Sequence, residues 1–219
     1  MLQLHYSPTD ASMAPHIVLE ELSLPYELLL VDRSVLAQKS PEYLQLNPNG
    51  TIPTLVHGDL VIYETAAIMM YVAELQPEAG LLPMVGTAER GAFYKWMFWL
   101  ANTLHSSLIP FFYGERWVAA GNAAGATEVK WQAQIRVKSL LQILDNELAT
   151  SKQKYLLGER FSLLDIYALM LCRWTRDFDS AACAPARDWP HLRPYLERIL
   201  ARPSVQRVYA KEGIVAPLI

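Results

Sequence analysis

The sequence has only two cysteines, Cys172 and Cys183, too few for a disulfide framework or for a cysteine-based metal cluster. Cys172 lies in an apolar stretch, so we expect it to be a buried and inert thiol. No apolar run approaches the ~20 residues that cross a bilayer. Residues 1–6 have neither the basic segment nor the long apolar core of a signal peptide. We therefore expect a cytoplasmic protein with no bound metal and no membrane partner.

An excess of charge of either sign is also absent. With 19 Lys and Arg and 22 Asp and Glu, the net charge is −3, which argues against a general nucleic-acid-binding protein. Hydrophobic residues make up 52% of the chain and charged residues 19%, a composition typical of a well-packed globular protein that argues against disorder. At 219 residues, the chain has room for one large domain or two modest ones.

The most informative stretch is residues 47–74, NPNGTIPTLVHGDLVIYETAAIMMYVAE. It begins with a turn, because Pro fixes φ and Gly or Asn tolerates positive φ. Two short apolar runs, residues 54–56 and 60–62, flank His-Gly-Asp, which predicts a β-hairpin with Gly in its loop. A helix is expected to start at residues 64–65, because good helix formers with an apolar face follow.

The polar residues at this helix start favour a particular ligand. Thr65 is placed to cap the helix, and the free amides of a helix N-terminus attract a carboxylate. Glu64 offers a negative charge to an ammonium group. A ligand with a free α-amino acid end would suit this pair. The alternative is that Thr65 is only a cap and Glu64 only an acid of the first turn.

The order of these pieces closely resembles the glutathione-binding half of the cytosolic glutathione transferase superfamily. The resemblance rests on Gly-Thr-Ile-Pro-Thr-Leu at residues 50–55, the hairpin, and then Glu64-Thr65-x-Ala-Ile. It implies that glutathione is the co-substrate and that Glu64 and Thr65 bind it. It also implies that Pro53 is cis, although few X–Pro bonds are. The backbone of Ile52 would then pair with the cysteinyl part of glutathione.

The N-terminal third alternates between strands and helices. The expected strands are residues 2–6, 26–31, 54–56 and 60–62, and the expected helices begin at residues 14 and 64. Residues 26–31 are a continuous apolar run, which suits a buried strand. A parallel pair joined by a helix and followed by an antiparallel hairpin gives a mixed four-stranded sheet with helices on its faces. This α/β pattern is the thioredoxin-like arrangement that the family uses.

A segment rich in Pro and Gly, residues 76–86, interrupts this pattern. We therefore expect a thioredoxin-like, glutathione-binding domain at residues 1–76, a linker at 77–86, and an all-α domain at 87–219. The first expected helix of the second domain covers residues 87 to about 117, and Pro110 should kink or end it. A loop at residues 121–125 is followed by a second long helix at 129–148. Three further helices are expected, one that starts near residue 162, one at 191–200 and one at 204–211.

Residues 161–166 predict the start of one of these helices. Ser162 and Asp165 have the spacing of a capping box, and Phe161 and Ile166 that of a hydrophobic staple. Such a box adds on the order of 1 kcal/mol to its helix. It resembles the box that starts the buried central helix of the family's helical domain. Its role there is folding, not chemistry.

The family works by stabilising a thiolate. A free thiol has a pKa near 8.5, and lowering it by ~2 units needs ~2.7 kcal/mol of preferential stabilisation. A hydroxyl donor together with a helix dipole can supply this. The family places the donor at the end of the first strand or the start of the first helix. The candidates here are Tyr6, Ser7, Thr9 and Ser12.

The first helix is most similar to that of bacterial members, which begins with a pattern like YSPxxCSxAPHIxLEE. The cysteine of that pattern falls on Ala11, which excludes a mixed disulfide at this position. The resemblance then favours Ser12 as the catalytic hydroxyl, with Thr9 as its competitor, because another bacterial branch uses a threonine here. The alternative for Ser12 is a plain N-cap. We expect Tyr6 to pack near the site.

Further contacts follow from position in the family pattern. Gln38 matches a glutamine that touches the glycyl end of glutathione, and a solvated glutamine is its alternative. His105 matches a histidine directed toward the thiol, although the basic residue that follows it there is Ser106 here; a structural histidine is its alternative. The pocket for the second substrate would be lined by Phe112, Tyr113 and Trp117, which could equally be core or interface aromatics.

The resemblance implies a homodimeric glutathione transferase that activates the glutathione thiol and adds it to a small hydrophobic electrophile. Two alternatives stay open. One is another glutathione-dependent enzyme on the same scaffold, such as a peroxidase, an isomerase or a dehalogenase. The other is a non-catalytic binding or regulatory protein, because the usual cysteine is missing.

Overall fold

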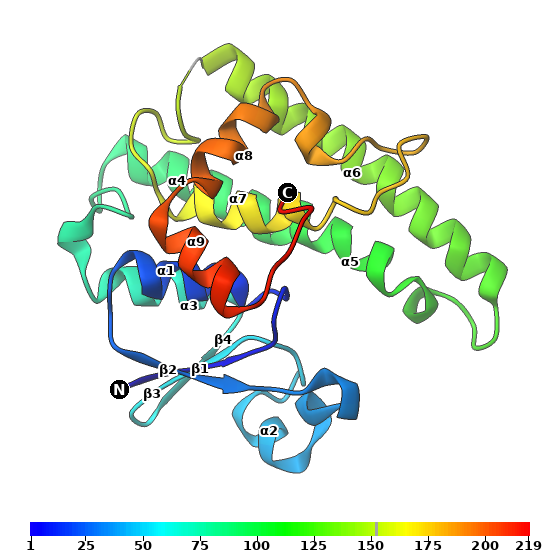
Figure 1. The fold of residues 1–219 in the computed structure, drawn as a ribbon, viewed down its shortest axis with the longest axis horizontal. Helices are drawn as coiled ribbons and strands as arrows, with labels where there is room; N and C mark the ends of the chain where they lie inside the picture. The colour runs from blue at the N-terminus through cyan, green and yellow to red at the C-terminus, as the bar shows by residue number, and fades with distance from the viewer. Residues whose placement is uncertain (152) are drawn as a thin grey trace. The chain divides into compact units, whose positions relative to one another are not determined.

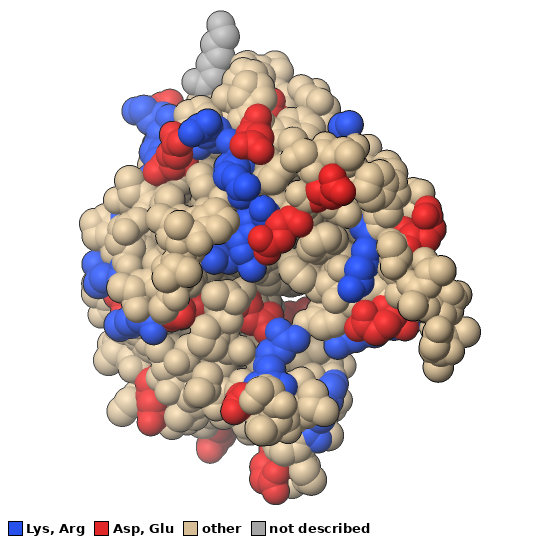
Figure 2. Space-filling view, turned by 45° about the vertical axis from the view of Figure 1, so that its right-hand side comes forward, with Lys and Arg blue, Asp and Glu red and all other residues tan. Residues whose placement is uncertain are grey.

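The computed structural model describes residues 1–151 and 153–219 (Figure 1). The chain forms two compact units. Met1–Leu82 and Leu200–Ala216 make up the first unit, and Pro83–Ile199 and Pro217–Ile219 make up the second. Within the described residues, no helix is both long and apolar enough to cross a bilayer. On the face shown in Figure 2, basic and acidic side chains are interspersed.

The first unit contains a sheet and the helices that pack on it. Its strands are β1 (Leu2–Tyr6), β2 (Tyr26–Leu30), β3 (Thr54–His57) and β4 (Leu60–Tyr63). Its helices are α1 (Met13–Glu21), α2 (Pro41–Leu46), α3 (Thr65–Glu74) and α9 (Pro203–Lys211), with short 3-10 turns at η1 (Arg33–Val35), η2 (Ala37–Lys39) and η3 (Pro77–Ala79).

The strand order is β2-β1-β3-β4, with β1 parallel to β2 and antiparallel to β3, and β3 antiparallel to β4. Leu4 of β1 lies between Leu28 and Leu55 and is fully buried, as alternation along a half-buried strand requires. Helices α1 and α3 pack against each other. The mixed sheet and its thioredoxin-like arrangement, predicted from the sequence, are confirmed.

Strand β2 differs from the expectation in its burial. Among the described strands it lies at an edge of the sheet, with β1 as its one neighbour. Its residues are half-buried or exposed, and Leu30 is 63% exposed. The prediction of a buried strand was therefore wrong, because an apolar run does not distinguish an edge strand from a central one. Val31, which follows the strand, is buried.

Helix α9 packs on α1, although it comes almost 200 residues later. At its start, Arg202 and Ser204 hydrogen-bond to the Glu21 carboxylate, Ser204 at 2.5 Å. Further along, Arg207 Nε donates to Glu20 Oε2 at 2.5 Å. Gly213, with φ +65°, follows the helix, as expected for its stop signal.

The second unit is helical. Its elements are α4 (Ala88–Trp99), the π-helical segment η4 (Leu100–His105), α5 (Ser106–Phe112), η5 (Gly114–Trp117), α6 (Ala123–Ser151), α7 (Leu163–Arg173), η6 (Ala186–Asp188) and α8 (Leu192–Leu200). Pro110 lies inside α5, which ends two residues later. The loop expected at residues 121–125 is shorter, because α6 starts at Ala123 and Asn122 Oδ1 accepts the Gly125 N–H at 2.8 Å.

Helix α7 is buried along its whole length, and the predicted capping box at its start is confirmed. The Asp165 carboxylate accepts the Ser162 N–H at 2.7 Å, and also the Leu156 N–H and the Tyr195 hydroxyl. Burial raises the pKa of Asp165 to about 6, although these hydrogen bonds oppose the shift. Cys172 of the same helix is a free thiol whose pKa is raised to about 12 by burial, as expected for an inert side chain.

Candidate functional site

The register of the sheet brings most of the predicted site residues to one end of the first unit. Thr54 of β3 pairs with both His5 and Tyr63. The segment that follows β1, the segment that precedes β3 and the segment that follows β4 therefore meet at this end. These segments contain Tyr6, Thr9 and Ser12, then Ile52 and Pro53, and then Glu64 and Thr65.

The segment before β3 is held by two buried side chains. Asn47 Nδ2 and the Tyr43 hydroxyl both donate to the Thr51 carbonyl oxygen, each at 2.8 Å. The Tyr43 hydroxyl also lies 2.9 Å from Thr54 Oγ1. Because one carbonyl takes two donors, the backbone from Thr51 to Thr54 is fixed independently of any ligand.

The Ile52–Pro53 peptide bond lies in this fixed segment and is cis, as predicted. In the described part of the chain, no hydrogen bond uses the backbone N–H or C=O of Ile52. A free amide and a free carbonyl beside the end of a strand can pair with the backbone of an extended peptide.

The start of α3 differs in detail from the prediction. Thr65 is the first residue of the helix, not its cap, and it is buried. Glu64 takes the flanking position with φ +75°, a conformation that is rare outside glycine, and its side chain makes no capping bond. The prediction that Thr65 caps the helix was therefore wrong. The amides of the first turn have no side-chain cap and are available to an anion, beside the exposed Glu64.

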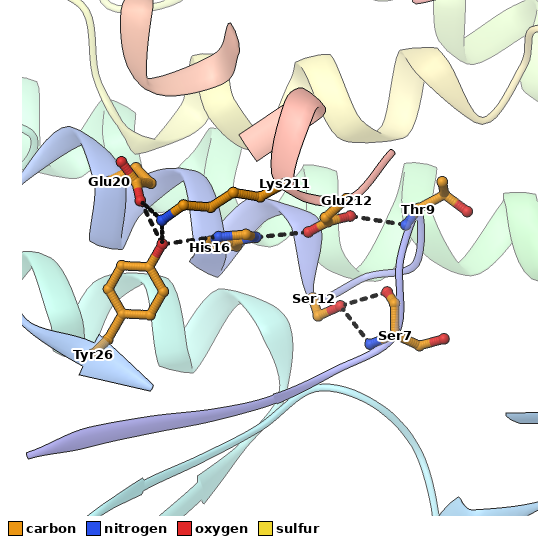
Figure 3. A network of polar contacts seen from close by, with 8 residues as sticks. All are labelled: Ser7, Thr9, Ser12, His16, Glu20, Tyr26, Lys211 and Glu212. Carbon is orange, nitrogen blue, oxygen red and sulfur yellow. Dashed lines mark hydrogen bonds and ion pairs between the residues drawn. The ribbon is translucent and has the colours of Figure 1, made fainter. Parts of the chain in front are cut away.

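The loop between β1 and α1 is organised by Ser12. Its Oγ donates to the Ser7 carbonyl at 2.9 Å and accepts the Ser7 N–H at 3.2 Å (Figure 3). The Ser12 side chain makes no capping bond to α1, so the plain N-cap alternative is not observed. Ser12 has no exposed surface, and its hydroxyl proton is already directed to a carbonyl.

Thr9 lies in the same loop and is partly exposed. Its φ is +64°, and its N–H donates to Glu212 Oε2 at 2.8 Å. Ala11 is buried. The Tyr6 ring packs at 6.3 Å from the ring of His16, in line with a packing role. Glu212 and His16 were missed by the sequence reasoning, because nothing in the sequence pairs residues so far apart.

Gln38 lies on the turn η2, against the bend at residues 47–50. A Cβ added at Gly50 would be 2.9 Å from the Gln38 carbonyl oxygen, so only glycine fits there. The Gln38 Oε1 is buried and has no hydrogen-bond partner among the described residues. Lys39 donates to the Asn49 carbonyl at 3.1 Å and was also missed by the sequence reasoning.

The remaining predicted residues belong to the helical unit. His105 Nδ1 lies 2.8 Å from the Tyr167 hydroxyl, and its ring packs at 5.0 Å from Trp174. Burial lowers the pKa of His105 to about 4, so the imidazole is neutral at pH 7. The Phe112 ring also packs against Trp174, with the two ring centroids 5.7 Å apart.

The other two predicted pocket residues have different surroundings. Tyr113 lies under the guanidinium of Arg116, at 3.7 Å from the ring centroid. Trp117 is 62% exposed. Within the described part of the chain, no group of three or more His, Cys, Asp or Glu side chains is arranged to hold a metal ion.

Comparison with known proteins agrees with the fold. The protein-family model of the glutathione S-transferase N-terminal domain matches residues 4–74 of this chain. The family model of the C-terminal domain matches residues 108–203. Glutathione S-transferase 3 from Zea mays is 32% identical, over 91% of this chain and 89% of the relative. A disulfide-bond oxidoreductase from Escherichia coli is 30% identical, over 96% of this chain and 95% of the relative.

A solved structure extends the agreement to three dimensions. The crystal structure of a glutathione transferase homologue from Sulfitobacter, with bound glutathione, superposes with a TM-score of 0.84. It is 30% identical and covers 98% of this chain and 99% of its own. The chain therefore belongs to the glutathione S-transferase family.

Proposed function

We propose that this chain binds glutathione at the end of its sheet and transfers the activated thiol to small apolar electrophiles. The observation that carries the proposal is the unused backbone N–H and C=O of Ile52, beside the uncapped start of α3. The cysteinyl backbone of the tripeptide pairs with Ile52. The γ-glutamyl carboxylate binds the first amides of α3, and its ammonium group binds Glu64.

The thiol needs a hydrogen-bond donor from the loop between β1 and α1. We assign this role to Thr9 and not to Ser12. The Ser12 hydroxyl is fully buried and donates to Ser7, whereas the Thr9 side chain is partly exposed in the same loop. Ser12 then has an indirect role, because it holds the backbone of the loop.

The rest of the site follows the family pattern. Gln38, whose Oε1 has no partner in the described chain, and Lys39 serve the glycyl end of the tripeptide. Phe112, Tyr113 and Trp117 of the helical unit supply apolar surface for the second substrate. His105 of the helical unit is a neutral imidazole at pH 7, because burial lowers its pKa to about 4. The active form is a symmetric homodimer.

A second function deserves the same test. The Escherichia coli relative at 30% identity is named a disulfide-bond oxidoreductase. Both cysteines of this chain are buried, so a disulfide exchange here would have to proceed through the thiol of glutathione itself.

Calorimetric titration with glutathione tests the binding step. We expect saturable heat for the wild type and an affinity about tenfold lower for Glu64→Gln, because a charge-assisted contact of ~1.5 kcal/mol is lost. Asp59→Asn removes the same charge from the exposed turn of the hairpin and serves as the matched control, with unchanged affinity. Absence of heat in the wild type, or equal losses in both variants, contradicts the proposed site.

Initial rates then separate the reactions. The wild type is assayed with glutathione and chlorodinitrobenzene, and separately with glutathione and hydroxyethyl disulfide. Conjugation without disulfide reduction supports the transferase, and the reverse result supports the oxidoreductase. Binding without turnover of either substrate would assign the chain to the non-catalytic members of the family.

A further inference from the structure

Glu212 connects the end of α9 to the loop that carries Thr9, within the first unit (Figure 3). Its Oε2 accepts the Thr9 N–H at 2.8 Å, and its Oε1 lies 2.7 Å from Nδ1 of His16. The side chains of Glu212 and His16 have no exposed surface. One buried carboxylate therefore links three segments: the end of α9, the first turns of α1, and the loop between β1 and α1.

The hydrogen bond to Thr9 holds an unusual backbone conformation. Thr9 has φ +64°, which is uncommon for any residue with a Cβ and is a marked outlier for a β-branched one. Such a conformation is strained and persists only where its surroundings impose it. A hydrogen bond from a backbone N–H to a carboxylate is about twice as strong as a neutral one, so Glu212 is a strong constraint on this residue.

On the side of the His16 ring away from Glu212, Tyr26 and Glu20 complete the network. The Tyr26 hydroxyl donates its only proton to Glu20 Oε1 at 2.5 Å. His16 Nε2, at 3.0 Å from the same hydroxyl, must therefore donate to it.

Burial opposes the charge of Glu20, yet hydrogen bonds from Arg207, Lys211 and Tyr26 outweigh it and lower its pKa to about 2. Glu20 is thus an acceptor at neutral pH. On the other side of the ring, Nδ1 of His16 faces Glu212 Oε1 at 2.7 Å. The Glu212 carboxylate is therefore held from two sides, by the Thr9 N–H and by Nδ1 of His16.

We propose that Glu212, oriented by His16, is a positioning residue that holds Thr9 in the conformation needed to activate the glutathione thiol. This inference rests on the proposed function for its catalytic consequence. It also makes a statement about the loop that does not depend on glutathione: the Thr9 amide is protected by the carboxylate of a residue 203 positions away.

Two measurements on three variants test the proposal. The rate at which the Thr9 amide hydrogen exchanges with solvent, measured by heteronuclear NMR, reports how firmly the loop is held. The ultraviolet absorption of the thiolate, recorded across pH with glutathione bound, reports the pKa of the bound thiol. The variants are Glu212→Ala, Glu212→Gln and Arg202→Ala. Arg202→Ala is the matched control, because it removes the contact of α9 with Glu21 and leaves Glu212 in place.

In Glu212→Ala we expect Thr9 exchange at least tenfold faster and a rise of about one unit in the pKa of the bound thiol, a tenfold change in the ionisation equilibrium. The dissociation constant of glutathione changes much less, because Ile52 and α3 are untouched. Glu212→Gln keeps an oxygen that accepts the Thr9 N–H, so both readouts are intermediate. Arg202→Ala changes neither.

Unchanged exchange and an unchanged thiol pKa in Glu212→Ala overturn the proposal, and so does an equal change in Arg202→Ala. If Glu212→Ala does not fold, Glu212→Gln decides: its Thr9 amide must exchange several-fold faster than in Arg202→Ala, and equal rates reject the idea. If the wild type does not bind glutathione, the proposed function fails, while the exchange data still decide whether Glu212 holds the loop.

Discussion

The Glu212 carboxylate lies 2.7 Å from Nδ1 of His16, although 196 positions separate the two residues. The contact makes the end of the chain part of the unit that carries the candidate site. The unit that carries the candidate site is therefore not only the first 82 residues.

Gly50 and Gly58 both have positive φ, but their surroundings differ. A Cβ at Gly50 would lie 2.6 Å from Lys39 Nζ and 2.9 Å from the Gln38 carbonyl oxygen, whereas a Cβ at Gly58 meets nothing within 4 Å. We expect Gly58→Ala to cost about 1 kcal/mol of unfolding free energy, from the strained backbone alone. Gly50→Ala should cost more and should also weaken glutathione binding. Urea denaturation and calorimetry measure the two effects, and equal costs would show that crowding at Gly50 is unimportant.

Ser12→Ala removes both hydrogen bonds to the Ser7 backbone. We expect a loss of about 1–3 kcal/mol of unfolding free energy, because the Ser7 N–H and C=O lose a buried partner. The exposed Ser34→Ala should stay within about 0.5 kcal/mol of wild type. Denaturant titrations of the two variants provide the comparison. A rise in the pKa of bound thiol larger in Ser12→Ala than in Thr9→Ala would return the catalytic role to Ser12.

The ionised Glu20 carboxylate should stabilise the folded protein, and this contribution should be lost in acid. Burial raises its pKa, but hydrogen bonds from Arg207, Lys211 and Tyr26 outweigh this effect and lower the pKa from its ordinary value of 4.5 to about 2. Between these values the unfolded chain binds more protons than the folded one, so stability falls as pH drops from about 4.5 to 2. The effect is on the order of 1 kcal/mol after solvent screening of the partly exposed Arg207 and Lys211. Glu20→Gln should flatten this part of the profile, and an unchanged profile would contradict the assignment.

His105 should remain neutral well below pH 6. Burial lowers its pKa to about 4 in the folded protein, from its ordinary value of 6.5. The unfolded chain therefore binds more protons in this window, and stability falls by up to about 3 kcal/mol as pH drops from 6.5 to 4. The imidazole proton shifts in NMR spectra measure the pKa directly. A midpoint near 6.5 would show that water reaches the ring and would reopen a cationic role toward the thiol.

The features that the sequence predicts well are those set by neighbouring residues. The hairpin depends on the Gly58-Asp59 turn and its flanking apolar runs, and the capping box depends on Ser162 and Asp165. Both are confirmed, as is the cis bond before Pro53, which the family pattern implied. Such signals act over a few residues, so they are readable without the fold.

The features that it predicts poorly depend on contacts from distant segments. Thr9 and Glu64 have positive φ without being glycine, so their conformations carry no compositional signal. The burial of β2 depends on its place at the sheet edge. The partners of Ser12 and His16 appear only once the loop and α9 are folded against α1.

The most direct test of the account is an NMR titration of the wild-type protein with glutathione. We expect saturable shifts of the backbone amides of Ile52, Thr65 and Ala66, at one common dissociation constant, with smaller changes at Thr9. Shifts confined to other parts of the chain, or no shifts at millimolar glutathione, would contradict it.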